Sequence, residues 1–370
     1  MIRLPFIRPQ EVQSNGPLQM NIVRRIKVID SHTAGEPTRV VIEGVPTLEG
    51  STLSEKEADF LANHAELGKL LVGEPRGHAP WHSVIPLPPV QPQADLSILI
   101  VSALGSLAMC GHALIGLVTT FIETGRIPAR EPTTRVVVET LSGLVTATAQ
   151  VEGGRVVAVT FAGVPSWVAL TGMEVEVAGR LFEVDLAYGG NWFALVRIEQ
   201  TGLAIEVEEI PNLVALGHRI RLKVNRLLSE SSDWPMGTPD QVDQLLYVGP
   251  PASSGADGQN LVTSTGLGFD RSPCGTGCCA RMAWHHVRGE MGLGDRFVHE
   301  SVINTIFVGE IRAVNQVMRG GPAGAALGWE IIPTITGSAH LTAFNELVLD
   351  RHDPLGEGFF LPAAGGAPPT

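Results

Sequence analysis

Cysteine is scarce in this sequence. Only four of its 370 residues are cysteine, and their positions are too uneven for a disulfide scaffold: Cys110, Cys274, Cys278 and Cys279. Residues 1–19 lack a continuous apolar stretch, so the pattern predicts no secretory signal peptide. We therefore expect free thiols and a cytoplasmic protein, because disulfides rarely persist in that reducing compartment.

Basic residues are also in short supply. Lys and Arg number 26 against 38 Asp and Glu, which gives a net charge of −12. An acidic surface repels phosphate backbones and anionic lipid headgroups, so we expect neither nucleic acid nor a membrane as partner. A small-molecule substrate is the partner that remains, and a homodimer is compatible with the sequence.

Charge is missing altogether from residues 96–122, a stretch long enough to span a bilayer. Polar and glycine residues interrupt it, among them Ser102, Gly105 and His112. A buried strand at 96–101, a turn and a buried helix at 113–124 account for the pattern better than a membrane span does.

The apolar residues, 44% of the chain, are enough for a sizeable core. Runs rich in Val, Ile and Thr predict strands at 25–30, 39–43, 96–101, 134–139, 144–150, 155–161, 181–187, 192–196 and 303–317. Helices are predicted at 53–64 (capped by Ser54), 113–124, 212–230 and 278–291. Strands outnumber helices without a regular alternation, so the expected fold class is α+β.

The length suggests two domains, at roughly 150 residues per domain. The sequence also repeats itself faintly, because the segments 109–128 and 273–292 both have Cys-Gly at their second and third positions and continue as a predicted helix that ends near glycine. We predict a flexible extension, two lobes with one Cys-Gly motif each, and a flexible tail: 1–19, 20–175 completed by 350–362, 176–349, and 363–370.

The two Cys-Gly motifs suggest proton-transfer chemistry. A helix N-terminus offers unpaired N–H groups and a positive dipole end, which attract a carboxylate and favour a thiolate. If the two helix starts face each other, one thiolate removes an α-proton while the opposite thiol delivers a proton to the other face. This is the arrangement that a cofactor-independent racemase needs.

Other interpretations of the cysteines stay open at this point. A buried cysteine is usually a small packing residue. Zinc is disfavoured because Cys274, Cys278 and Cys279 lack the usual spacing and a second ligand pair. The segment 275–280 fits a dinucleotide-binding glycine pattern, but no strand is predicted directly before it. A Cys–His nucleophile is also conceivable, with these candidate partners: His112, His285 and His286.

Two longer motifs resemble those of a known family. Met109-Cys-Gly-His112 and Asp270-Arg-Ser-Pro-Cys-Gly-Thr-Gly277 are similar to the two signature motifs of the proline racemase family, which includes 4-hydroxyproline 2-epimerases and trans-3-hydroxyproline dehydratases. The likeness runs from about Ile26 to about Phe360 and includes the segments 30–37, 74–78, 187–193 and 353–355.

The resemblance implies two pseudo-symmetric lobes, each a curled and mostly antiparallel sheet around a central helix, as in diaminopimelate epimerase. The active site would lie in the cleft between the lobes. Cys110 and Cys274 would be the two acid/base thiols, and Asp270 would pair with the ring nitrogen of the substrate. The substrate carboxylate would be held by Gly111, His112, Gly275 and Thr276. The family uses no metal, pyridoxal phosphate or nucleotide.

The resemblance also distinguishes the branches of the family. Its dehydratases typically have threonine where this chain has Cys274, so the chain resembles a racemase or epimerase. The segment Asn191-Trp-Phe193 is similar to hydroxyproline epimerases. The expected activity is therefore epimerisation of 4-hydroxyproline at its α-carbon. Proline racemase is the first alternative, followed by a 3-hydroxyproline dehydratase and a non-catalytic imino-acid-binding protein.

Overall fold

The computed structural model describes residues 22–361, except 104, 232, 233, 235, 236, 265–267, 322 and 323. The extension predicted at 1–19 and the tail predicted at 363–370 lie outside the described residues. Within the described residues, 17 strands join into one extended sheet that does not close on itself.

The strands alternate between hairpins and longer crossovers. Those of the first half are β1 (Ile22–Thr33), β2 (Glu36–Glu43), β3 (His82–Leu87), β4 (Leu96–Ser102), β5 (Gly105–Leu107), β6 (Thr133–Thr140), β7 (Gly143–Glu152), β8 (Arg155–Ala162) and β9 (Trp167–Val177). The second half contains β10 (Arg180–Tyr188), β11 (Trp192–Arg197), β12 (Gln244–Gly249), β13 (Gly258–Thr263), β14 (Arg296–Glu300), β15 (Ile306–Gly321), β16 (Gly324–Gly337) and β17 (Ala339–Asp350).

Five α-helices accompany them in the described part of the chain: α1 (Leu53–Asn63), α2 (Ala65–Val72), α3 (Gly111–Glu123), α4 (Ile210–Glu230) and α5 (Gly275–Val287). The predicted cap of α1 was wrong. The Thr52 side chain, not that of Ser54, accepts the backbone N–H of Glu55, and the Glu55 carboxylate accepts the backbone N–H of Thr52, which makes a capping box. Helix α5 also begins three residues earlier and ends four residues earlier than the predicted 278–291.

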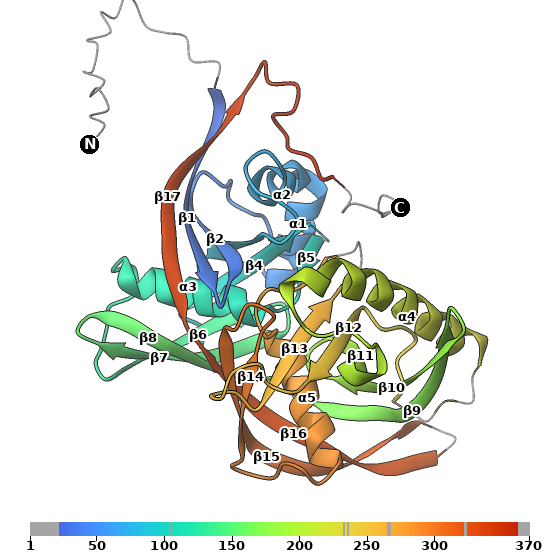
Figure 1. The fold of residues 1–370 in the computed structure, drawn as a ribbon. Helices are drawn as coiled ribbons and strands as arrows, with labels where there is room; N and C mark the ends of the chain where they lie inside the picture. The colour runs from blue at the N-terminus through green and yellow to red at the C-terminus, as the bar shows by residue number, and fades with distance from the viewer. Residues whose placement is uncertain are drawn as a thin grey trace, which may run out of the picture.

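Helix α3 forms the centre of the first lobe. It packs against β1, β2, β7, β8 and β17 and lies between the β1–β17 ribbon and the β7–β8 hairpin (Figure 1). All its residues except Phe121 and Glu123 are buried, as is every residue of β4. This burial by protein explains the charge-free stretch at 96–122. None of the described helices is long and apolar enough to cross a membrane.

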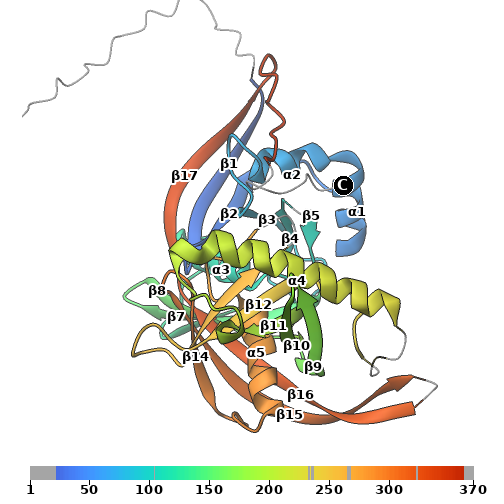
Figure 2. The same cartoon turned by 45° about the vertical axis from the view of Figure 1, so that its right-hand side comes forward.

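Helix α5 has the same place in the second lobe. It packs against β9, β10, β15 and β16, and its apolar side lies in the core. Helix α4 runs across β9, β12 and β13 (Figure 2), with Leu213, Ile220 and Val224 buried beneath it. The predicted architecture of two lobes with a helix at the centre of each, in the α+β class, is confirmed.

Strands from the end of the chain tie the lobes together. β17 pairs with β1 from Ala339 opposite Thr33 to Asp350 opposite Ile22. β16 pairs with β8 through residues 334–337. The lobe boundaries stay a prediction, but residues 339–349, assigned above to the second lobe, pair with a strand of the first.

Candidate active site

The two Cys-Gly motifs meet at the centre of the molecule. Cys110 and Cys274 occupy the N-cap positions of α3 and α5, so the prediction that each cysteine begins a helix is confirmed. A Cβ atom built on Gly111 would lie 3.6 Å from the Cα of Gly275, and one built on Gly275 would lie 3.6 Å from the Cα of Gly111. The N-terminal ends of both helices therefore point into one shared site.

Both thiols are protonated in this environment. Burial raises the pKa of Cys110 to about 12, and the negative charge of Asp270 adds to the shift. Burial likewise raises the pKa of Cys274 well above its usual range, again with a contribution from Asp270. Backbone N–H groups at the helix starts oppose these shifts, as expected from the positive end of the helix dipole.

The backbone before α5 is held in an unusual conformation. Cys274 has a φ of 65°, in the left-handed region that non-glycine residues rarely adopt. Its N–H donates to Ser272 Oγ at 3.1 Å, and the Ser272 N–H donates to Asp270 Oδ1 at 2.8 Å. The Asp270 carboxyl group is also close enough to the Cys274 thiol to raise its pKa. Strain of this kind is typical of functional sites, where the surroundings fix a side chain in one position.

A second carboxyl group lies near Asp270. Glu36 accepts the backbone N–H of Arg271 at 2.8 Å and forms an ion pair with its guanidinium at 3.7 Å. Burial and the charge of Asp270 raise the pKa of Glu36 well above its usual range. Glu36 was not among the predicted site residues, although it lies in the family-like segment 30–37. The sequence signal that could have identified it was the presence of an acidic residue within that segment.

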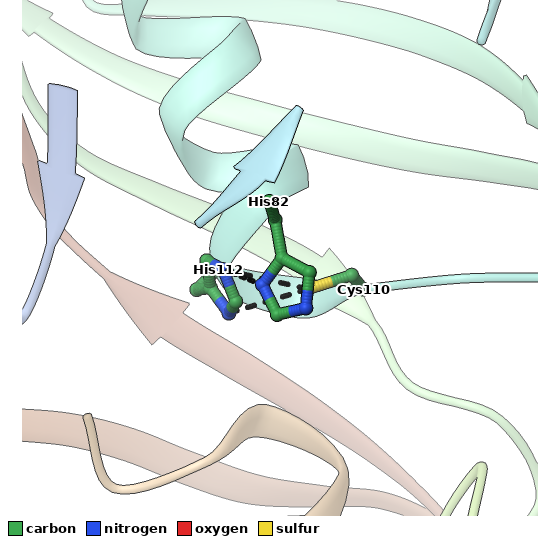
Figure 3. A group of neighbouring side chains, drawn as sticks. All are labelled: His82, Cys110 and His112. Atoms are coloured by element: carbon green, nitrogen blue, oxygen red, sulfur yellow. Dashed lines mark hydrogen bonds between the residues drawn. The ribbon is translucent and has the colours of Figure 1, made fainter. Parts of the chain in front are cut away.

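Three side chains converge at the start of α3. His82, on β3, places Nδ1 2.7 Å from Nε2 of His112, and His112 Nδ1 lies 3.2 Å from Cys110 Sγ (Figure 3). Burial lowers the pKa of His82 to about 4 and that of His112 well below its usual value. Both imidazoles are therefore neutral at pH 7, and one donates to the other. Nothing in the sequence singled out His82, which lies outside the quoted motifs.

The turn between β10 and β11 supports the start of α5. Asn191 Nδ2 donates to Thr276 Oγ1 at 3.3 Å, and Thr276 Oγ1 lies 3.6 Å from Cys274 Sγ. A Cβ on Gly189 would lie 2.2 Å from the Thr276 carbonyl oxygen, so only glycine fits there. The family-like segment 187–193 thus positions a predicted site residue.

The remaining cysteines of α5 pack into the core, and its two histidines lie at the far end of the helix from Cys274. Cys278 and Cys279 are buried in the core cluster around α3 and α5. His285 bonds to Glu290 at 2.6 Å, and His286 lies in the same last turn of the helix. Both histidines are therefore at the opposite end of α5 from Cys274 and cannot activate its thiol as a nucleophile. Only His112, of the three histidines considered, contacts a candidate thiol.

The chain also matches known proteins along almost its whole length. The family model described as proline racemase matches residues 28–360. A proline racemase from Clostridioides difficile is 36% identical over 92% of this chain and 100% of its own length. A 4-hydroxyproline 2-epimerase from Streptosporangium roseum is 38% identical over the same shares.

Solved structures agree with these matches. A hydroxyproline epimerase from Agrobacterium vitis, with bound trans-4-hydroxy-L-proline, has a TM-score of 0.77 and 31% identity, covering 92% of this chain and 96% of that chain. A probable proline racemase from Agrobacterium radiobacter, with bound carbonate, has a TM-score of 0.76 and 31% identity, covering 91% and 96%.

The fold, together with these matches, defines an isomerase of the racemase and epimerase class. The chain belongs to the proline racemase family. The family resemblance stated from the two signature motifs is thereby confirmed.

Proposed function

We propose that the protein epimerises 4-hydroxyproline at its α-carbon, with Cys110 and Cys274 as the two acid/base groups. The observation that carries the proposal is the meeting of the two helix N-termini, each with a cysteine at its cap position. A substrate carboxylate between these ends would accept hydrogen bonds from backbone N–H groups of both helices. One thiol would lie on either side of it.

The proposed reaction begins with the substrate carboxylate at Gly111, His112, Gly275 and Thr276. The ring nitrogen, which is positively charged, lies beside Asp270. One cysteine removes the α-proton as a thiolate, and the other donates its proton to the opposite face. The helix ends stabilise the negative charge that develops on the carboxylate oxygens.

A thiolate requires an acceptor for the thiol proton, since both thiols are protonated in the structure. Polar groups lie beside each thiol. His112 Nδ1 lies 3.2 Å from Cys110 Sγ. Thr276 Oγ1 lies 3.6 Å from Cys274 Sγ, and the Asp270 carboxyl group is close enough to act on that thiol. In this scheme either thiol can act as the base, which reversible epimerisation in both directions demands. The scheme requires no cofactor, and the free thiols it uses suit the cytoplasm.

Proline racemase is the second candidate function. The relative with that name is 36% identical to this chain, close to the 38% of the Streptosporangium epimerase, so overall similarity does not separate the two substrates. A 3-hydroxyproline dehydratase is less favoured because both cysteines are present.

Chiral chromatography after incubation with three substrates tests the proposal. The reduced protein should convert trans-4-hydroxy-L-proline to cis-4-hydroxy-D-proline faster than it converts L-proline to D-proline. The reverse preference would make it a proline racemase. Loss of water from trans-3-hydroxy-L-proline would make it a dehydratase, and no product from any of the three would leave a binding protein.

A further inference from the structure

His82 contacts the proposed machinery but has no part in the proton transfer described above. It comes from β3 and reaches the start of α3, where it lies with Cys110 and His112 (Figure 3). One nitrogen or sulfur atom from each of these three residues lies within 4.8 Å of the other two. Two imidazoles and one thiol are a ligand set that Zn²⁺ prefers.

We propose that His82, Cys110 and His112 form a binding site for a thiophilic divalent cation such as Zn²⁺, and that the bound cation inhibits the enzyme. The binding half of this inference stands on the geometry of the three residues. The inhibition half rests on the proposed function, because it takes Cys110 as one of the two acid/base groups.

The distances suit such a site after a small adjustment. Zn–N bonds of about 2.0 Å and Zn–S bonds of about 2.3 Å, at tetrahedral angles, place two nitrogens about 3.3 Å apart and sulfur about 3.6 Å from nitrogen. Cys110 Sγ already lies 3.7 Å from His112 Nε2. His82 Nδ1 and His112 Nε2 are 2.7 Å apart. They must separate by about 0.6 Å to bind one cation, which a small rotation of the imidazole rings would achieve.

The protons balance in this reaction. The Cys110 thiol releases its proton to solvent when sulfur binds the cation. The proton shared by the two imidazoles moves to a ring nitrogen that does not bind the metal, so both rings stay neutral. Three protein ligands leave a fourth position for water or for the substrate carboxylate.

The surroundings favour a cation at this place. Asp270 and Glu36 lie close enough to Cys110 to act electrostatically on its thiol. A nearby cation in turn stabilises the ionised form of both carboxyl groups. Cys274, across the site, is buried and shares the influence of Asp270, so it is the natural matched control for Cys110.

The test uses Co²⁺ as a spectroscopic substitute for Zn²⁺ and requires no substrate. Adding Co²⁺ to the reduced protein should produce the near-ultraviolet absorption of a thiolate–cobalt bond and intense visible bands of tetrahedral cobalt, and Zn²⁺ should remove both. Cys110→Ala should abolish the absorption, His82→Gln should weaken the affinity for Co²⁺ at least about tenfold, and Cys274→Ala should retain it. Circular dichroism checks that each variant is folded.

Three spectroscopic results would overturn the binding proposal. One is an absorption band that persists in folded Cys110→Ala, and another is no band in the folded wild-type protein. Loss of the band in Cys274→Ala would also contradict it, because the cation would then bridge the two thiols. Absence of epimerase activity with a normal cobalt spectrum would refute the proposed function and leave the binding site intact. If Zn²⁺ does not reduce the activity of the wild-type protein, the inhibition half of the proposal is refuted.

Discussion

The backbones of Gly111 and Gly275 face each other across the two lobes, and a Cβ built on either would lie 3.6 Å from the Cα of the other. This close approach brings the N-termini of α3 and α5, and with them Cys110 and Cys274, to one site. The two glycines differ in one respect. A Cβ on Gly111 would lie 2.7 Å from Phe161 Cζ, whereas a Cβ on Gly275 would lie 3.5 Å from it.

The Phe161 contact predicts unequal effects of alanine at the two glycines. Gly111→Ala forces the buried Phe161 ring or the helix start to move, and we expect kcat/KM to fall on the order of a hundredfold. Gly275→Ala makes only an ordinary contact with the ring and should lose less. Steady-state kinetics of both variants with 4-hydroxyproline check this. Equal losses would mean that Phe161 does not fix the position of α3.

The two-thiol scheme predicts that Cys110→Ala and Cys274→Ala each abolish epimerisation, because each removes the acid/base group proposed for one face of the substrate. Cys279→Ala is the matched control, since Cys279 is buried in the core cluster around α3 and α5. This substitution should change kcat by less than about threefold. Chiral chromatography of the product measures all three. Full activity in either catalytic variant would refute the mechanism.

The raised thiol pKa predicts how alkylation depends on pH. With the pKa of Cys110 at about 12, the thiolate fraction is small near neutrality and grows with every increase in pH. The rate of inactivation by iodoacetamide should therefore rise about tenfold per pH unit from about pH 7 to about pH 9, without a plateau. Pyrrole-2-carboxylate, a planar mimic of the deprotonated substrate, should protect. A plateau in this range would show a thiolate in the substrate-free enzyme.

The lowered pKa of His82 predicts a loss of stability in mild acid. Its pKa is lowered from 6.5 in the unfolded chain to about 4 in the folded protein. Between these values the unfolded chain binds the proton and the folded protein does not, so the free energy of unfolding decreases as the pH falls from about 6.5 to about 4. Urea unfolding at several pH values measures the slope.

His82→Gln should reduce this slope, because glutamine does not titrate. The control is His352→Gln, which changes an exposed side chain and should leave the slope as in the wild-type protein. A slope unchanged by His82→Gln would contradict the burial of a neutral imidazole at this position.

Local sequence patterns predicted the parts of the fold that depend on local structure. The Cys-Gly motifs marked the first turns of α3 and α5, and runs rich in β-branched residues marked strands such as β6 and β8. Strands β12 and β13 were missed because Gln244–Gly249 and Gly258–Thr263 are short and nearly all buried, so they lack the alternation that identifies a strand. The pairing of β17 with β1 joins the ends of the chain and has no local signal.

The residues of the candidate site also fall into two groups, those in local motifs and those that only tertiary packing brings together. The predicted site residues in the two motifs, such as Cys110 and Asp270, belong to contiguous segments that can be recognised in the sequence. Glu36 and His82 reach the site from β2 and β3, and only tertiary packing brings them there. A lone histidine in a sequence gives no indication that its imidazole will lie 2.7 Å from another one.

Proton exchange at the α-carbon tests the central claim most directly. Proton NMR of the reduced wild-type protein in D₂O with trans-4-hydroxy-L-proline should show loss of the α-proton signal together with the appearance of the other diastereomer, deuterated at that carbon. Cys110→Ala and Cys274→Ala should form no diastereomer. A diastereomer that retains its original α-proton, or one that forms in either variant, would contradict proton transfer by two cysteines on opposite faces of the substrate.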